Sequence, residues 1–171
     1  MSKELLELIK VLARKQPVLA KALNSPATEA DITLLEKTVG ISLPQDFVAA
    51  LRTGNGQSEK FHGIFDGNHF LSIAEIVNNW NIWKMLLEGG DFDNAKSKPE
   101  NGIKYGWWNP RWIPFTSNGS GDHFCIDMDP SSEGTMGQII FVWHDMADRQ
   151  CVSDSFSTWL SALCAVEGGK P

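Results

Sequence analysis

Three residue types that often catalyse reactions or bind metals alternate along one short segment, His123-x-Cys125-x-Asp127. On an extended strand every second side chain points to the same side, so these three would share one face. Their neighbouring backbone positions would lie about 6.5 Å apart, whereas a nucleophile and its base need hydrogen-bond contact. We therefore interpret Cys125 as a buried thiol and His123 as a residue at the rim of a sheet, and we expect no catalytic site here.

The spacing of the possible metal ligands argues against a metal site. The other cysteines and histidines occur singly, so a zinc ion near Cys125 would lack further ligands. Four acidic residues suggest a calcium loop, but Pro130 interrupts the pattern and no Glu closes it at the twelfth position; they are Asp122, Asp127, Asp129 and Glu133. We expect neither a metal nor a cofactor to be needed for folding.

The glycine-rich motifs of common enzymes are missing from the sequence. Neither GxxxxGK nor GxGxxG, which cradle phosphates, is present, and GxSxG, which presents a nucleophilic serine, is also absent. Together with the poor geometry expected at residues 123–127, this absence favours a protein without enzymatic activity.

Acidic charge is concentrated at the end of the chain. The net charge is −6, and residues 121–171 contain eight Asp and Glu but only two Lys and Arg. Nucleic-acid binding requires clustered basic residues, so we do not expect it. No apolar run reaches 18 residues, so we expect no membrane segment. An acidic surface of this kind is suited to a basic protein partner.

Length and composition indicate one intracellular domain. A chain of 171 residues with 42% hydrophobic residues is long enough for a single core. Its three cysteines are odd in number and form no CxxC pair, which favours a reducing compartment. The N-terminus alternates charge with leucine and does not resemble a secretory signal. We therefore expect a cytoplasmic protein, and the sequence leaves its oligomeric state open.

Helices are predicted to precede the strands. An apolar stripe predicts a helix over residues 4–23, and Thr28 with Asp31 forms a capping-box pattern for a second helix that ends at Gly40. Pro44 begins a third, short helix. Ser72 with Glu75 forms another capping-box pattern, which predicts a helix up to Gly89 and Gly90.

The remaining segments alternate like strands and turns. Asp66-Gly67-Asn68 is typical of a hairpin turn between residues 61–65 and 69–71, whereas residues 91–104 are polar and predict a surface loop. Strands are expected at 112–115, 122–128, 138–143 and around 151–152, followed by a helix from about residue 154 to Gly168. The run 138–143 is apolar throughout, which predicts a central strand covered on both faces.

Two groups of aromatic residues lie before and within the first of these strands. Tyr105, Trp107 and Trp108 occur in a glycine-bounded loop, where they would either cover the sheet edge or stack on a partner. Trp112 and Phe115, with Pro114 tolerated at an edge or strand end, are expected to serve structure and not binding.

A set of short motifs resembles the SMI1/KNR4 family, also called SUKH, over roughly residues 28–165. The motifs occur in the family's order, and each is quoted as it stands in this sequence: Leu43-Pro44-x-Asp46-Phe47, Asn55-Gly56, Trp112-x-Pro114-Phe115, Gly121-Asp122, Asp127, Asp129-Pro130, Gly137-Gln138-Ile139 and Phe156-x-x-Trp159-Leu160.

The resemblance implies an α+β fold, a single SUKH-like domain with a mixed, mainly antiparallel sheet and helices packed against it. It places this domain at residues 26–171 and leaves residues 1–25 as an additional N-terminal helix. It also implies a non-enzymatic protein-binding role. Bacterial members are mostly immunity proteins that neutralise polymorphic toxins, often nucleases, and fungal members regulate cell-wall synthesis.

We therefore expect an immunity protein that binds a basic toxin domain stoichiometrically, and the alternative is an intracellular scaffold or regulator like the fungal members. The expected contacts are the acidic residues of the last third together with two loop tryptophans: Asp122, Asp127, Asp129, Glu133, Asp145, Asp148, Trp107 and Trp108.

Overall fold

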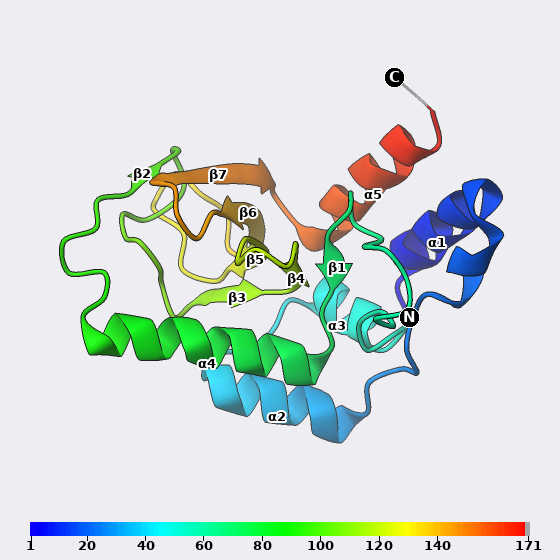
Figure 1. The fold of residues 1–171 in the computed structure, drawn as a ribbon, viewed down its shortest axis with the longest axis horizontal. Helices are drawn as coiled ribbons and strands as arrows, with labels where there is room; N and C mark the ends of the chain where they lie inside the picture. The colour runs from blue at the N-terminus through cyan, green and yellow to red at the C-terminus, as the bar shows by residue number, and fades with distance from the viewer. Residues whose placement is uncertain (170–171) are drawn as a thin grey trace.

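The computed structural model describes residues 1–169 and is built around a five-stranded sheet (Figure 1). Neighbouring strands are antiparallel except for one parallel pair at the edge, between β2 and β7. In spatial order the strands are β2 (Lys98–Pro99), β7 (Asp148–Ser153), β6 (Gln138–Val142), β5 (His123–Asp127) and β3 (Trp112–Pro114). The apolar strand β6 lies in the middle, as predicted, and the α+β fold class is confirmed.

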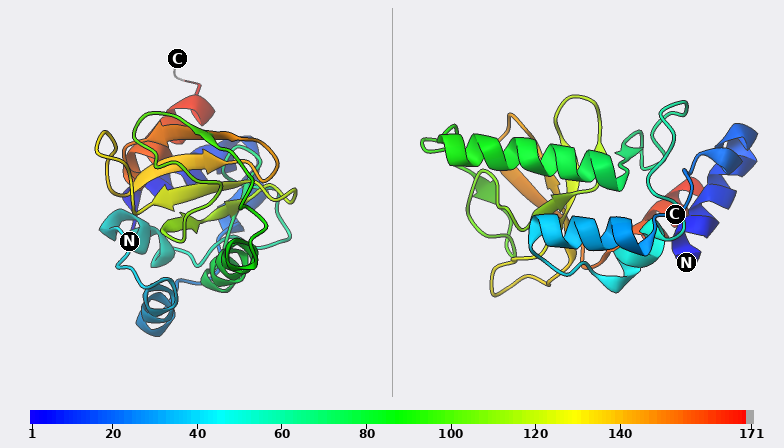
Figure 2. Two further views of the ribbon diagram at one scale, coloured as in Figure 1. Left: turned by 90° about the vertical axis from the view of Figure 1, so that its left-hand side faces the viewer. Right: turned by 90° about the horizontal axis from the view of Figure 1, so that it is seen from below.

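Helices surround this sheet. They are α1 (Lys3–Lys15), α2 (Glu29–Val39), α3 (Gln45–Leu51), α4 (Ile73–Gly89) and α5 (Phe156–Glu167). Helix α2 packs along α4, and α1 packs against α5 (Figure 2). Both capping boxes form, with Thr28 and Asp31 at the start of α2 and Ser72 and Glu75 at the start of α4. The sequence therefore predicted both helix starts correctly.

The two faces of the sheet are covered by different helices, α5 on one face and α4 on the other. Phe124 points toward α5, where its ring centroid lies 5.1 Å from that of Trp159. His123, the next residue back, points to the opposite face, where its ring packs edge-on against Trp83 of α4. Because successive side chains of a strand alternate between faces, β5 contributes to two packed layers. No helix within residues 1–169 is both long and apolar enough to cross a membrane.

The first predicted helix is interrupted. Instead of continuing to residue 23, α1 ends at Lys15, and a 3₁₀ helix, η1, follows over Pro17–Lys21. The backbone of Gln16 is extended, with φ −136° and ψ 93°. A proline disfavours the α conformation at the residue before it, so Pro17 accounts for the break.

The predicted hairpin around residues 66–68 forms only at its turn. Asp66 and Gly67 have positive φ angles of 50° and 78°, and Phe65 and Asn68 exchange backbone hydrogen bonds across them. Strand β1 (His69–Phe70) pairs with β4 (Thr116–Ser117), and residues 61–65 contribute only isolated bridges. A buried side chain explains this, because Gln57 Oε1 accepts hydrogen bonds from the backbone N–H groups of both Ile64 and Phe70, at 3.0 Å each. Donors that would otherwise be available for pairing are bound to an amide.

The segment 91–104 is not entirely loop, contrary to expectation. Its residues Lys98 and Pro99 form β2, which lies parallel to the start of β7. The carboxylate of Glu100 then accepts a hydrogen bond from the backbone N–H of Cys151, at 2.9 Å, and so satisfies a donor beyond the end of the short strand. A polar composition did not reveal this pairing, which depends on the neighbouring strand.

Candidate protein-binding surface

The three residues with the most reactive chemistry are all in the interior. His123, Cys125 and Asp127 share one face of β5, as predicted, and all three are buried. The expectation of a rim position for His123 is therefore wrong. Burial lowers the pKa of His123 and raises the pKa of the Cys125 thiol, so both groups are held neutral. These side chains form part of the core on the α4 side of the sheet.

Asp127 is buried and is connected to the segment after β2 through hydrogen bonds of Gln138. Its Oδ2 accepts a hydrogen bond from Gln138 Nε2 at 2.9 Å, and its Oδ1 accepts one from the backbone N–H of Asp129, also at 2.9 Å. Gln138 Nε2 donates in addition to the carbonyl oxygen of Gly102 at 2.9 Å. Since Asp127 has no exposed surface, it does not belong to a contact surface, and the expectation for this residue is corrected.

The other predicted acidic residues lie at two ends of the sheet. Asp122, Asp145 and Asp148 lie where β5 and β7 begin and β6 ends, and we call this group the acidic end. Asp129 and Glu133 lie in the connection from β5 to β6, at the opposite end. The five residues of β5 separate the groups by about 16 Å at 3.3 Å per residue. The acidic residues of the last third therefore do not form one continuous face.

Within the acidic end, Asp122 holds the turn after β6 in place. Its Oδ1 accepts hydrogen bonds from the backbone N–H of His144 at 2.9 Å and from the ring Nδ1 at 2.8 Å, and its Oδ2 accepts one from Asn118. Desolvation alone would raise the pKa of Asp122, but these hydrogen bonds outweigh it and lower the pKa. Hydrogen bonding to Asp122 is also the main reason that the pKa of His144 is raised.

Asp122, His144 and Asp145 also bring three potential metal ligands within 4.8 Å of one another. They form the only such group among residues 1–169, and two of the three are exposed. The Asp122 carboxylate is already bonded to His144 and Asn118, so the group is explained as a turn-stabilising ion pair.

The group at the opposite end carries less unmatched charge. Asp129 forms an ion pair with Lys104 and accepts a hydrogen bond from Asn109 at 3.1 Å. The hydrogen bond from Lys104 is the main cause of the lowered pKa of Asp129. Glu133 is exposed. The acidic end, where Asp145 and Asp148 are exposed, is therefore the better candidate for contact with a basic partner.

The two loop tryptophans have different surroundings. Trp108 is buried and stacks on Trp83 of α4, with ring centroids 6.1 Å apart and an angle of 15° between the planes. It covers the sheet and is not exposed for contact, so the binding role expected of it is corrected. Trp107 is half-buried, and Tyr105 has 68% of its surface exposed. Trp107 and Tyr105 remain available at the surface.

Sequence reasoning missed Arg149, a fully buried cation on β7. Its guanidinium lies 4.8 Å from the ring centroid of Trp107. The same group donates to the carbonyl oxygen of Trp107 through Nε at 3.1 Å and Nη2 at 2.6 Å, and to those of Met146 and Asp148 through Nη1. A lone arginine in a polar strand gives no signal of this role, which depends on the folded loop.

Comparison with known proteins gives matches over most of the chain. The model of the SMI1/KNR4 family (SUKH-1) matches residues 26–162. A cell wall biosynthesis/cell cycle regulator, smi1, from Schizosaccharomyces pombe is 28% identical over 84% of the chain and 32% of its own length. The cell wall assembly regulator SMI1 of Saccharomyces cerevisiae is 22% identical over 84% of the chain and 36% of its own length.

A glucan synthesis regulatory protein from Neurospora crassa is 23% identical over 86% of the chain and 34% of its own length. The chain therefore spans about a third of the length of these curated relatives. All three relatives are described as regulators, and the similarity is confined to one part of each protein.

Proposed function

The chain belongs to the SMI1/KNR4 (SUKH-1) family, and from this premise we propose that it acts by stoichiometric protein binding without catalytic turnover, as an immunity protein that neutralises a toxin. One observation carries the proposal most directly. Asp145 and Asp148 are exposed beside Asp122 at one end of the sheet, where they present acidic groups to a basic partner such as the substrate groove of a nuclease.

The interior position of the reactive residues supports a non-enzymatic role. Cys125 and His123 are buried and neutral, and the Asp127 carboxylate is bonded to Gln138 and to the backbone of Asp129. A catalytic group must touch its substrate, whereas the ring of His123 packs against Trp83 of α4, and Cys125 and Asp127 are buried on the same face of β5.

The second candidate function is that of an intracellular scaffold or regulator. The names of the fungal relatives favour it, because each is described as a regulator of cell-wall biosynthesis, cell-wall assembly or glucan synthesis. Both candidates are protein-binding functions, so they differ in the partner and not in the type of surface.

A direct test uses the product of the gene next to this one. The purified chain is titrated calorimetrically with the protein encoded there, and the two are co-expressed in a growth assay that reports whether that protein is toxic alone. We expect a 1:1 complex and restored growth. If the neighbouring product neither binds nor is neutralised, the immunity role is wrong, and the regulator alternative becomes the better one.

A further inference from the structure

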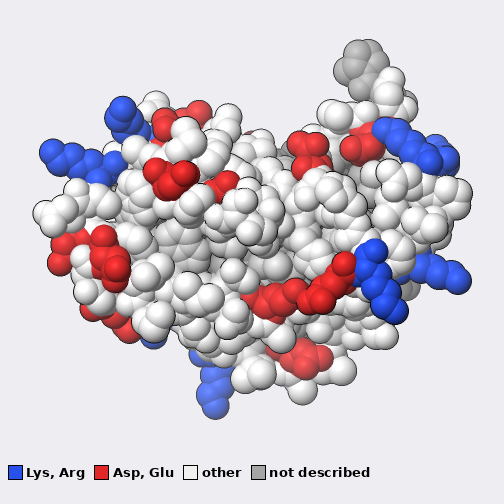
Figure 3. Space-filling view, in the orientation of Figure 1, with Lys and Arg blue, Asp and Glu red and all other residues white. Residues whose placement is uncertain are grey.

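A polar hollow of about 550 Å³ lies beside the start of α4. It is open to solvent, and three segments border it: the loop 59–69, the first turns of α4 and the turn 117–119. A second hollow of about 400 Å³ adjoins it, and the carboxylates of Glu59 and Glu75 line both. In the space-filling view, a row of acidic side chains lies over this part of the molecule, below β1 and near the start of α4, and a basic side chain adjoins its right-hand end (Figure 3).

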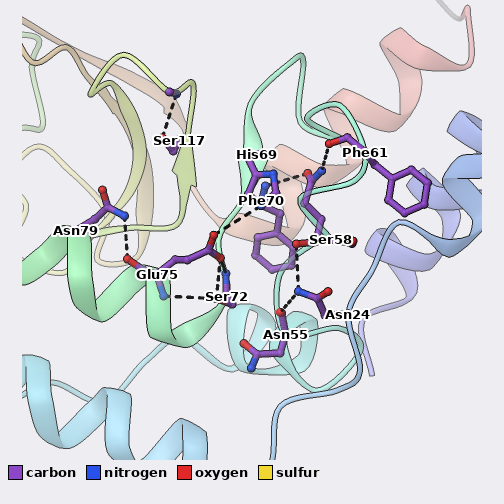
Figure 4. Close-up of polar contacts among 12 residues, drawn as sticks. Asn24, Asn55, Ser58, Phe61, His69, Phe70, Ser72, Glu75, Asn79 and Ser117 are labelled. Atoms are coloured by element: carbon purple, nitrogen blue, oxygen red, sulfur yellow. Dashed lines mark hydrogen bonds and ion pairs between the residues drawn. The ribbon is translucent and has the colours of Figure 1, made fainter.

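One of the two carboxylate oxygens of Glu75 accepts no hydrogen bond from the described residues and can accept one from a ligand. Its Oε2 accepts hydrogen bonds from Ser72, from the backbone N–H at 2.7 Å and from Oγ at 2.6 Å, and so completes the capping box (Figure 4). Its Oε1 faces His69, whose Nε2 is 3.9 Å away. No hydrogen-bond donor reaches Oε1 within the described part of the chain, and the buried Nε2 of His69 likewise has no hydrogen-bond partner there.

Glu59 adds a second acidic group on the facing loop. It is exposed and forms no ion pair with any residue that the structure describes. The charged and titratable groups around the two hollows are these two carboxylates, the imidazoles of His62 and His69, and Lys60, which lines only the smaller hollow. The residues that line the larger hollow therefore include no lysine or arginine.

Amide groups complete the lining. Asn78 lines the hollow, and Asn79 donates from Nδ2 to the carbonyl oxygen of Glu75 at 2.8 Å. This hydrogen bond leaves the side-chain oxygen of Asn79 as an acceptor. On the far rim, Asn118 donates to Asp122 Oδ2 at 2.7 Å, so the hollow adjoins the acidic end directly.

We propose that this hollow binds a cationic side chain, Arg or Lys, from a basic segment of a protein partner. Carboxylate and amide oxygens accept hydrogen bonds from a guanidinium or ammonium group, and bonds that involve an ionised group are the stronger kind. The rest of the segment then continues past Asn118 to Asp122 and Asp145. That the ligand is part of a protein rests on the proposed function, whereas recognition of the cation rests on the hollow itself.

The test uses the full-length, ¹⁵N-labelled chain and short capped peptides. Acetyl-Gly-Arg-Gly-Arg-Gly-amide, its Lys counterpart and its Glu counterpart are titrated while amide signals are followed by NMR. We expect saturable shifts for the basic peptides in residues 59–69, 75–79 and 117–119, and none for the Glu peptide. Spermidine is a fourth probe, and if it binds as tightly as the peptides the site is one for free polyamines and the peptide proposal is wrong.

Glu75→Gln and Glu59→Gln remove charge with little change of shape. Gln at position 75 retains the capping box, so α4 should still form. We expect each variant to weaken binding of the Arg peptide by about two- to fivefold, in line with the energy of an exposed ion pair. Glu88→Gln is the matched control, because Glu88 lies on the same helix but pairs with Lys84 and does not line the hollow.

Three results would overturn the proposal: equal weakening by Glu88→Gln and Glu75→Gln, shifts centred away from the hollow, or no saturable shift with either basic peptide. The proposed function is tested separately. If the Glu59→Gln/Glu75→Gln double variant binds the toxin domain with unchanged affinity, the hollow is excluded while protein binding stands. If the unaltered chain binds no toxin domain but still binds the basic peptides, the function fails and the cation site stands.

Discussion

Asp127 and Gln138 are Cα partners on β5 and β6, and Gln138 Nε2 donates to Asp127 Oδ2 over 2.9 Å inside the protein. The same amide nitrogen donates to the carbonyl oxygen of Gly102. One side chain therefore connects two central strands to the segment that carries the aromatic loop. Asp127, which the sequence predicts to lie in the binding surface, instead stabilises this loop from inside the protein by accepting a hydrogen bond from Gln138.

Replacing Asp127 with alanine should destabilise the protein. The variant leaves the N–H of Asp129 and one donor site of Gln138 without their partner, and we expect a loss of about 1–3 kcal/mol in the free energy of unfolding. Urea denaturation measures this loss. Asp127→Asn, which keeps an acceptor oxygen, should cost less, and an equal loss in both variants would contradict the role of the hydrogen bonds.

The same carboxyl should make stability depend on pH. Burial raises the pKa of Asp127 above its ordinary value of 3.8, so the folded chain binds this proton more tightly than the unfolded chain does. Its contribution to stability therefore falls as the pH rises from about 4 through the raised pKa. Urea denaturation at several pH values should show that the free energy of unfolding of the wild type increases relative to that of Asp127→Asn as the pH is lowered toward 4. A difference between the two proteins that does not change with pH would contradict the raised pKa.

His144 should titrate above its ordinary pKa of 6.5 because Asp122 stabilises its charged form. A raised pKa means that the stabilisation is complete below pH 6.5 and is lost as the pH rises through the folded value. NMR titration of the imidazole checks this directly. Asp122→Asn should return the pKa of His144 toward 6.5, and an unchanged pKa in this variant would contradict the role of Asp122.

Arg149 should not tolerate replacement by lysine. Its planar group donates to three backbone carbonyl oxygens and lies over Trp107, whereas a lysine ammonium cannot reproduce that geometry. We expect Arg149→Lys to cost about 1–3 kcal/mol of stability through the carbonyls left unbonded. Tryptophan fluorescence during thermal unfolding measures the effect, and unchanged stability would show that water replaces the guanidinium without cost.

Trp112→Ala should cost about 3–5 kcal/mol, because the ring is fully buried and its removal leaves a cavity. Thermal or urea denaturation measures the loss. Reduced partner binding with full stability would instead place Trp112 in the binding surface.

The two acidic groups can be compared with variants that remove equal charge. Asp145→Asn/Asp148→Asn should slow association with a basic partner and flatten its salt dependence, because surface charges mainly set the association rate. Asp129→Asn/Glu133→Gln, the matched control, should change the rate less, since Asp129 is already paired with Lys104. Stopped-flow measurements at two salt concentrations distinguish them, and equal effects would contradict a special role for the acidic end.

Local patterns in the sequence determined much of the fold. The capping boxes at Thr28 and Ser72 depend on residues three positions apart, and the central position of β6 follows from an apolar run. The alternation at residues 123–127 also placed His123, Cys125 and Asp127 on one face. Each of these features is decided by neighbours along the chain, which is why a single sequence reveals it.

Only the tertiary structure decided which side chains face solvent and which meet one another. Gln57, which lies outside the predicted hairpin, accepts hydrogen bonds from two backbone N–H groups that the hairpin strands would have used. Arg149 finds one of its three carbonyl acceptors, that of Trp107, on a loop 42 residues away. Asp127 and Asp145 are both acidic in sequence, but one lies inside the sheet and the other on its surface. Charge and hydropathy along the chain give no distances between segments, so burial and long-range hydrogen bonds, which depend on those distances, appear only when the chain is folded.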